Sequence, residues 1–236
     1  GVVAKFDPAT YSDAIAFARI GEGSLGGKAR GLAFMNSMLV KYCQYAKYEN
    51  VRVTIPRTVV VATDYFDAFI RNNGLEYVLT TEMTDEEILS EFVSSTLPYK
   101  LREALKAYVR TVSGPLAVRS SSKLEDSHYQ PFAGIYSTYM IPYTEGNEDR
   151  QLRLLQKAIK SVYASTYFAA SKAYVQSSQN LIAEEKMAVV IQEVCGTEQD
   201  GLFFPTLSGV ARSINYYPIG DETPEEGVCN IALGLG

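Results

Sequence analysis

The spacing of hydrophobic residues along the chain changes several times between a helical and a strand-like period. Apolar positions recur every three or four residues in a helix, whereas in a strand they alternate or form short continuous runs. The helical period predicts helices over residues 9–19, 27–47, 64–72, 84–94, 98–112 and 147–175. Strand-like runs cover residues 51–54, 58–62, 116–119, 135–141, 186–194, 201–204, 208–217 and 228–233.

The order of these elements predicts an α+β fold. Towards the C-terminus, strand follows strand through short turns, which is typical of a mainly antiparallel sheet rather than of repeated βαβ units. With 236 residues, 47% of them hydrophobic and 21% charged, the chain can bury the core of one large domain or of two lobes. We expect a first lobe over residues 1–114 and a second lobe over residues 115–236.

A glycine-rich loop, GEGSLGGKARGL at residues 21–32, precedes the second predicted helix. Glycines allow backbone N–H groups to approach an anion closely, and the N-terminus of a helix adds partial positive charge. Lys28 adds a full positive charge at the same place. The loop is therefore a candidate phosphate-binding element.

Three familiar glycine motifs do not fit this loop. The Walker motif fails because Glu22 and Ala29 stand where it needs Gly and Ser or Thr. The dinucleotide-binding pattern G-x-G-x-x-G is present, but it requires a preceding buried strand, and residues 9–19 are predicted to form a helix. The glycine loop of protein kinases fails because Lys28 stands where it needs a hydrophobic residue.

A second polar segment, LAVRSSSKLEDSHYQPFAG at residues 116–134, begins as a strand and ends in a loop. Arg119 offers a fixed fork of N–H donors to phosphate oxygens, and the serines at residues 120–122 add hydroxyl and backbone donors. An arginine after a strand is more often a partner in a surface ion pair. This segment alone leaves both interpretations open.

The segments GGKARGL, LAVRSSSKLEDSHYQPFAG, MAVVIQEVCG and NIALGLG occur in an order and spacing that resemble the nucleotide-binding domain of phosphoenolpyruvate synthase and pyruvate phosphate dikinase. The resemblance covers about residues 21–236. It implies an ATP-grasp-like fold, in which two lobes clamp ATP, and transfer of a phosphoryl group from ATP to a histidine elsewhere in the same polypeptide and then to pyruvate. Two alternatives stay open: another acceptor, such as an antibiotic or a glucan, and a module that senses ATP without transfer.

The resemblance also implies which residues hold the nucleotide. Lys28 and Arg119 match the family's phosphate-binding residues, and we expect both to be catalytic because phosphoryl transfer depends on neutralising the developing charge. The FAG loop would close over the phosphates, and the strand end QEV would pass beside the adenine, although VVIQEV alone fits an ordinary strand equally well. The remaining nucleotide-binding residues that the resemblance implies are Ser120, Gly134, Thr138, Gln192, Glu193 and Val194.

Other charged side chains carry weaker expectations. His128 is the single histidine, yet the resemblance puts the phosphorylated histidine in a separate downstream domain, so we do not expect His128 to be the acceptor. Glu125 and Asp126 match the family's ED pair, but such a pair in a loop is more often a cap or an arginine partner than a metal site. Arg57 could add positive charge near the site or pair with Glu22 at the surface.

The last residues resemble the start of a family segment, GLGE, that is followed by acidic and amide residues. Those residues would hold Mg²⁺, which prefers oxygen ligands, so we expect the metal ligands beyond Gly236 and none among the residues of this chain. The chain is therefore expected to be a piece of a longer polypeptide that is inert by itself. Its expected partners are ATP and the downstream phosphohistidine and acceptor-binding domains.

Composition excludes several other classes of protein. A net charge of −5 argues against a general nucleic-acid or membrane binder, which needs excess Lys and Arg. No apolar run approaches the roughly 20 residues of a membrane span. Cys43, Cys195 and Cys229 lack C-x-x-C spacing, so neither a disulfide framework nor a zinc site is indicated. The expected compartment is the cytoplasm.

Overall fold

The computed structural model describes residues 3–42, 48–122, 136–177 and 185–235. The chain divides into two compact units, Gly1–Glu193 and Val194–Gly236. The strand that carries Arg119 belongs to the six-stranded sheet of the first unit. The expected lobes, with a boundary between residues 114 and 115, stay a prediction.

The first unit is built on a six-stranded sheet with the strand order β1-β2-β3-β6-β4-β5. Strands β1, β2 and β3 run parallel to one another, while β3, β6, β4 and β5 pair antiparallel. The prediction of a mainly antiparallel sheet is confirmed, but it missed the βαβ unit formed by β2, α1 and β3. The strands are β1 Ala4–Lys5, β2 Phe17–Ile20, β3 Thr58–Val61, β4 Leu116–Ser122, β5 Tyr139–Ile141 and β6 Met187–Glu193.

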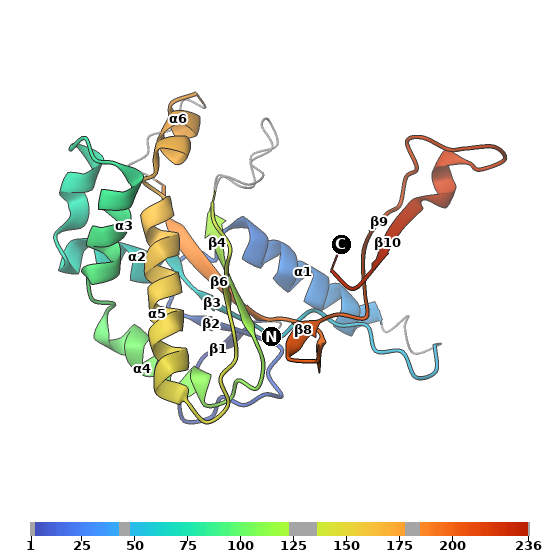
Figure 1. The fold of residues 1–236 in the computed structure, drawn as a ribbon, viewed down its shortest axis with the longest axis horizontal. Helices are drawn as coiled ribbons and strands as arrows, with labels where there is room; N and C mark the ends of the chain where they lie inside the picture. Colours follow the sequence, from blue (N-terminus) through green and yellow to red (C-terminus); the bar gives the residue numbers. More distant parts are fainter. Residues whose placement is uncertain (1–2, 43–47, 123–135, 178–184, 236) are drawn as a thin grey trace. The chain divides into compact units, whose positions relative to one another are not determined.

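Helices cover both faces of this sheet, with α1 on one side and α2, α3, α4 and α5 on the other (Figure 1). Because successive strand residues point to opposite faces, Val59 and Val61 pack in the larger core with the helices α2 to α5, whereas Val60 packs in the smaller core beneath α1. The helices are α1 Gly26–Tyr42, α2 Thr63–Asn72, α3 Asp85–Ser94, α4 Tyr99–Val109, α5 Glu148–Ser165 and α6 Ala169–Ser177, with a 3-10 helix at Leu75–Leu79.

Several helix ends follow directly from the local sequence. The hydroxyl of Thr84 accepts a hydrogen bond from the backbone N–H of Glu87 at 3.2 Å, and the Glu87 carboxylate accepts one from the Thr84 N–H at 2.8 Å. This reciprocal pair caps α3 and is worth about 1 kcal/mol in comparable helices. After α2, Gly74 adopts a left-handed conformation with φ of 62°, which ends the helix.

The predicted helix over residues 9–19 is wrong. Phe17–Ile20 instead forms β2, a largely buried strand between β1 and β3, and the Thr58 N–H donates to the Ala16 carbonyl at 2.9 Å. Eleven residues of weak helical period could not compete with hydrogen bonds to two neighbouring strands, because tertiary context overrides local propensity. The prediction at residues 51–54 is also wrong: this exposed segment, within the described range, forms no strand.

The predicted helix over residues 147–175 is two helices. α5 ends at Ser165, whose hydroxyl donates to the Val162 carbonyl at 2.6 Å, while the Ser171 hydroxyl donates to the Ser165 carbonyl at 2.7 Å. Side-chain bonds of this kind compete with the regular helix ladder. The predicted strand over residues 135–141 is shorter in the described part of the chain, where β5 begins at Tyr139.

The apolar side chains along α1 are packed only in part. Leu32 and Leu39 lie against the smaller core, whereas Met35 and Tyr42 are each 49% exposed. The buried residues of α1 are concentrated in its first turn, at Gly26, Gly27 and Ala29. The contact that matters most for this helix is therefore made where the glycine-rich loop enters it.

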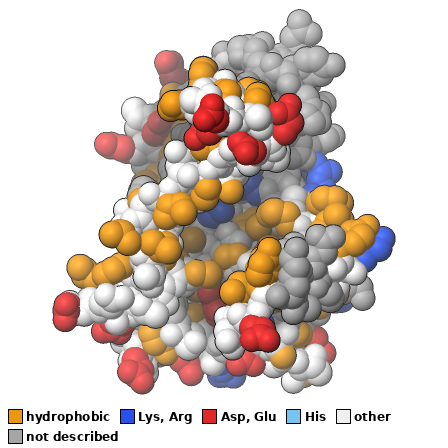
Figure 2. All heavy atoms as spheres, turned by 90° about the vertical axis from the view of Figure 1, so that its right-hand side faces the viewer, with side chains coloured by type: hydrophobic (Ala, Val, Ile, Leu, Met, Phe, Trp, Pro, Cys, Tyr) orange, Lys and Arg blue, Asp and Glu red, His pale blue; other side chains and the backbone are white. Residues whose placement is uncertain are grey.

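The second unit consists of two antiparallel hairpins. Strand β7, Thr197–Gln199, pairs with β8, Leu202–Phe204, and β9, Leu207–Arg212, pairs with β10, Val228–Leu233. The predicted strand over residues 208–217 ends early, because Asn215 accepts a hydrogen bond from the Tyr217 N–H and donates one to Glu222. Hydrophobic side chains of this unit remain at the surface (Figure 2).

Candidate phosphate-binding site

The start of α1 is seated directly on strand β4. Gly26 has φ of +71°, and a Cβ atom there would lie 1.9 Å from the backbone oxygen of Ser121, so only glycine fits this position. The Ser121 hydroxyl donates to the Leu25 carbonyl at 2.8 Å and accepts from the Ala29 N–H at 3.1 Å. These contacts fix the glycine-rich loop against the serine run.

This seating brings Lys28 to the strand that carries Arg119. The Lys28 Nζ atom lies 3.2 Å from the backbone oxygen of Ser120 and 3.3 Å from its hydroxyl. Ser120, which is 2% exposed, immediately follows Arg119 on β4. Lys28, on α1, thus contacts the residue that follows Arg119 on β4, although the two cationic residues are far apart in the sequence.

Arg119 is held by a neutral side chain from the neighbouring strand. Its Nη1 atom donates to the Gln192 Oε1 atom at 3.2 Å, and the Gln192 Nε2 atom donates to the Thr58 hydroxyl at 3.1 Å. Gln192 is 6% exposed, so its amide is committed to this hydrogen-bonded chain across β4, β6 and β3. The amide orients the guanidinium without neutralising its charge.

The other expected nucleotide residues are only partly brought together. Thr138 is exposed and immediately precedes β5, where Tyr139 pairs with Val118, so Thr138 lies at the Arg119 end of that ladder. Val194 is the first residue of the second unit, immediately after Glu193. The expected loop residue Gly134 lies outside the described residues, as do Glu125, Asp126, His128 and Cys43.

Arg57 does not pair with Glu22 at the surface. Its side chain is 9% exposed and forms an ion pair with Glu193, with the Arg57 Nε atom 2.9 Å from the Glu193 Oε1 atom. Its Nη2 atom also donates to the Thr111 carbonyl at 2.7 Å. Burial opposes the charge of Arg57, but the hydrogen bond and negative charge of Glu193 outweigh it and raise the pKa of Arg57.

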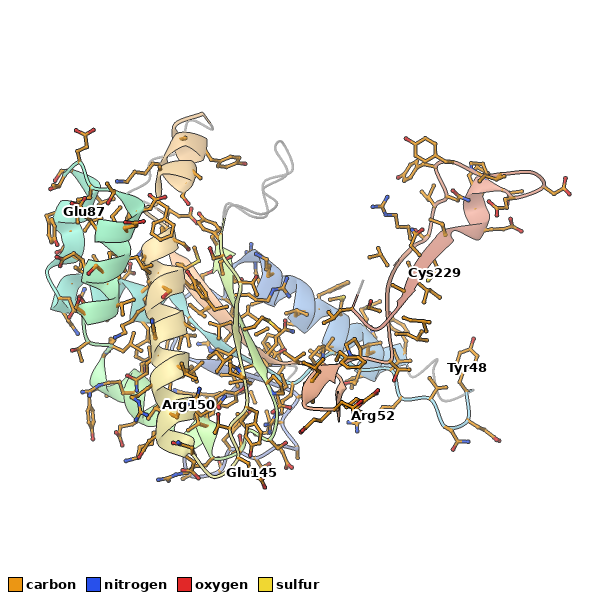
Figure 3. All side chains as sticks on the ribbon, viewed as in Figure 1. Tyr48, Arg52, Glu87, Glu145, Arg150 and Cys229 are labelled. Atoms are coloured by element: carbon orange, nitrogen blue, oxygen red, sulfur yellow. The ribbon has the colours of Figure 1, made fainter. Side chains whose placement is uncertain are left out.

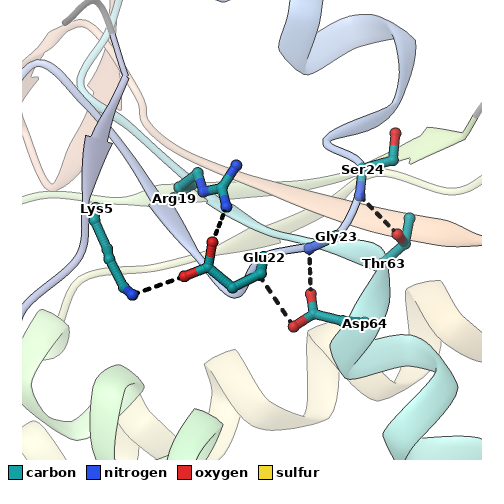
Figure 4. A network of polar contacts seen from close by, with 7 residues as sticks. All are labelled: Lys5, Arg19, Glu22, Gly23, Ser24, Thr63 and Asp64. Carbon is teal, nitrogen blue, oxygen red and sulfur yellow. Dashed lines mark hydrogen bonds and ion pairs between the residues drawn. The ribbon is translucent and has the colours of Figure 1, made fainter.

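The glycine-rich loop itself is held by α2 (Figure 4). The N–H groups of Glu22 and Gly23 donate to the two carboxylate oxygens of Asp64 at 3.1 and 3.0 Å, and the Ser24 N–H donates to the Thr63 hydroxyl at 2.9 Å. These three amides are therefore occupied by the protein's own side chains and do not form the anion cradle expected from the sequence. Lys28 and the start of α1 remain the candidate anion-binding groups of this loop.

This arrangement corrects one argument about the loop. A buried strand, β2, does precede the G-x-G-x-x-G pattern, so the reason given for excluding dinucleotide binding is wrong. What counts against a pyrophosphate at this part of the loop is the Asp64 carboxylate, which accepts hydrogen bonds from the N–H groups of Glu22 and Gly23. The sequence analysis missed Thr63 and Asp64, although a polar pair placed directly after the buried run TVVVA was a usable signal.

Glu22 completes the outer side of this network. Its carboxylate lies 2.7 Å from the Lys5 Nζ atom and also pairs with Arg19. The hydrogen bond from Lys5 and then the one from Arg19 lower the pKa of Glu22. Because Lys5 and Glu22 are exposed and Arg19 is only partly buried, we expect the ion pairs to order the loop with little gain in stability.

Metal-ligand groups and membrane-spanning helices are both absent from the described residues. The described part of the chain holds no group of three His, Cys, Asp or Glu side chains placed to bind a metal ion. Within the described ranges, every helix is too short or too polar to cross a lipid bilayer.

Comparison with known proteins assigns the chain to a family. It belongs to the pyruvate phosphate dikinase, AMP/ATP-binding domain family, which matches residues 22–236. The sequence-based resemblance is thereby confirmed. The chain is an AMP/ATP-binding domain of a phosphotransferase family.

Two curated relatives are similar over much of the chain. An uncharacterized phosphotransferase, YvkC of Bacillus subtilis, is 31% identical over 157 residues, which are 64% of this chain and 17% of the relative. The phosphoenolpyruvate synthase of Aeropyrum pernix is 29% identical over 202 residues, which are 76% of this chain and 22% of the relative. The chain thus spans about a fifth of the length of these relatives.

Proposed function

We propose that this chain is the ATP-grasp-like domain of an enzyme that transfers a phosphoryl group from ATP to a carrier histidine in a downstream domain, and from there to pyruvate. The observation that carries the proposal is the placement of Lys28 beside Ser120, the residue that follows Arg119. The family and the name of the Aeropyrum pernix relative support it. The two lobes, residues 1–114 and 115–236, belong to the same proposal.

Lys28 and Arg119 would act on the triphosphate as a pair. The Lys28 ammonium, now bonded to the oxygens of Ser120, would exchange them for phosphate oxygens, while the Arg119 fork keeps the orientation set by Gln192. Both charges would stabilise the negative charge that develops as the terminal phosphoryl group leaves. Thr138 and Ser120 would contribute hydroxyl contacts, and Gly134 would belong to the loop that covers the phosphates.

Bound Mg²⁺ would supply further neutralisation of the phosphates. Two cationic residues are a poor donor set for such an ion, and the oxygen ligands it prefers are not clustered in the described part of the chain. We therefore assign no Mg²⁺ ligand to these residues and propose that the ligands lie elsewhere in the polypeptide.

The phosphate assignment is tested by calorimetric titration of the full-length protein with ATP. Lys28→Ala and Arg119→Ala should each cost on the order of 2 kcal/mol of binding free energy, or about 30-fold in affinity, through loss of charge-assisted contacts. Arg52→Ala is the matched control, because Arg52 is an exposed arginine (Figure 3) and should leave the affinity unchanged. Unchanged affinity in both Lys28→Ala and Arg119→Ala would remove the assignment.

The transfer step is tested separately with ATP labelled at the β and γ phosphates. We expect an acid-labile phosphohistidine on the full-length protein, and label in phosphoenolpyruvate after pyruvate is added. A phosphohistidine that pyruvate does not discharge would support a different acceptor, such as an antibiotic or a glucan. Tight ATP binding with no phosphohistidine would support a module that senses ATP and would overturn the transfer proposal.

A further inference from the structure

We infer that Arg57 is a positioning residue for the base-side segment of the nucleotide site, residues 192–194. The inference rests on the proposed function, because it assumes that this segment lies beside the adenine. It adds a residue for which neither the resemblance nor the comparisons supply a role. Arg57 would act through Glu193 and would not touch the phosphates.

Arg57 holds the end of β6 by both its side chain and its backbone. Its Nε and Nη2 atoms donate to the Glu193 carboxylate, and its backbone carbonyl accepts a hydrogen bond from the Glu193 N–H at 3.0 Å. Its Nη2 atom also donates to the carbonyl of Thr111, just after α4. One residue thus ties the end of β6 to the entry of β3 and to the end of α4.

The surroundings of this contact make it rigid. Arg57 is only 9% exposed on its side chain, and burial is the largest influence on its pKa. Tyr108, three residues before the Thr111 whose carbonyl accepts a hydrogen bond from Arg57, is fully buried. A guanidinium in such a place is stable only while its carboxylate partner is present, so the Arg57–Glu193 geometry is strongly coupled to the fold.

The position of Glu193 explains how its contact with Arg57 would affect the base-side segment. Glu193 is the last residue of both β6 and the first unit, and the chain continues directly into Val194. Because the Glu193 N–H is already bonded to the Arg57 carbonyl, the next backbone N–H that could read a base edge is that of Val194. By fixing Glu193, Arg57 would set the direction in which the chain leaves β6, and it keeps the Glu193 carboxylate neutralised near a polyanionic ligand.

The inference predicts that base recognition depends on Arg57 whereas phosphate binding does not. The test compares ATP with inorganic tripolyphosphate, which has no base, in titrations of the full-length protein. The double variant Arg57→Met, Glu193→Gln removes both charges and so leaves no unpaired carboxylate. We expect its dissociation constant for ATP to rise about tenfold, while that for tripolyphosphate changes by less than about twofold.

A matched control is available in the same unit. Arg110 and Glu148 form an exposed ion pair with 3.5 Å between the Arg110 Nε and Glu148 Oε2 atoms. The double variant Arg110→Met, Glu148→Gln should change neither dissociation constant. Lys28→Ala should weaken both ligands, which separates an effect on the phosphates from an effect on the base.

Each outcome has a defined meaning. If the wild-type protein binds neither ATP nor tripolyphosphate, the proposed function itself is overturned. If it binds both but the Arg57→Met, Glu193→Gln variant keeps the wild-type ratio of the two dissociation constants, the positioning role is overturned while the phosphate site stands. Should that variant not fold, Arg57→Lys replaces it: the charge remains but the fork is lost, and the same ratio should shift in the same direction, with an unshifted ratio overturning the inference.

Discussion

Two neighbouring residues at the end of β6 each receive a hydrogen bond from an arginine, and the partners differ in charge. Arg57 donates to the Glu193 carboxylate, whereas Arg119 donates to the neutral amide of Gln192. Among the described residues, no carboxylate forms an ion pair with Arg119. Arginine therefore has two different roles in this region. Arg57, whose charge is neutralised by Glu193, stabilises the fold, whereas Arg119 is oriented by a neutral amide and keeps a charge that attracts phosphate.

A substitution at Gly26, where α1 lies against β4, should have the largest effect on stability and on ATP binding. Gly26→Ala would force a Cβ atom against the Ser121 carbonyl at a left-handed φ, so we expect it to cost about 3 kcal/mol of folding free energy and to weaken ATP binding strongly. Urea unfolding and ATP titration measure the two effects. Gly31→Ala, with open space around its Cβ position in the same helix, should be neutral or stabilise by about 0.5 kcal/mol. Equal stability of the two variants would contradict the seating of α1.

Removing the side chain of Arg57 should lower the free energy of unfolding more than removing that of Arg119. Arg57→Ala leaves Glu193 without its partner, and because that side chain is 27% exposed we expect about 2 kcal/mol, less than for a fully buried pair. Arg119→Ala removes a bond to a neutral amide and should cost no more than about 1 kcal/mol. Urea unfolding of both variants provides the comparison. A larger loss in Arg119→Ala would reverse the assigned roles.

A smaller effect of opposite sign is expected beside Arg57. The Tyr108 hydroxyl is buried without a hydrogen-bond partner, which is costly for a polar group. Tyr108→Phe should therefore stabilise the protein by about 1 kcal/mol in urea unfolding at neutral pH. Destabilisation would mean that the hydroxyl has a role in holding Arg57.

The last expected effect is confined to alkaline pH. Burial raises the pKa of Tyr11 to about 12, while the positive charge of Arg57 acts in the opposite direction. In the unfolded chain tyrosine ionises near pH 10, so this contribution to stability is complete below about pH 10 and is lost as the pH rises towards 12. Tyr11→Phe should lessen the fall in urea midpoint between pH 9 and 11. An unchanged slope would contradict the burial of this hydroxyl in the folded protein.

The sequence predicted those elements that have strong local signals. The helices predicted over residues 84–94 and 64–72 and the strand-like runs at residues 116–119 and 186–194 are all confirmed. By contrast, β2 was mistaken for a helix, because its four residues are specified by the strands on either side rather than by their own spacing. Short central strands are hard to predict for this physical reason.

Some residues of the candidate site were likewise predicted from the sequence, and others were missed. The glycines, Lys28 and Arg119 were found because their chemistry is visible in the sequence. Asp64 holding the loop amides and Glu193 holding Arg57 were missed, because these contacts join positions more than 40 residues apart and depend on the strand order. Which partner an arginine finds cannot be read from the arginine itself.

The central claim is that Lys28 and Arg119 bind one triphosphate together. A crystal structure of the full-length protein with a non-hydrolysable ATP analogue tests it most directly. We expect the Lys28 Nζ atom and the Arg119 guanidinium within hydrogen-bond distance of phosphate oxygens of the same nucleotide, with the Arg119–Gln192 contact retained. A nucleotide bound elsewhere, with either side chain directed away from its phosphates, would contradict the account.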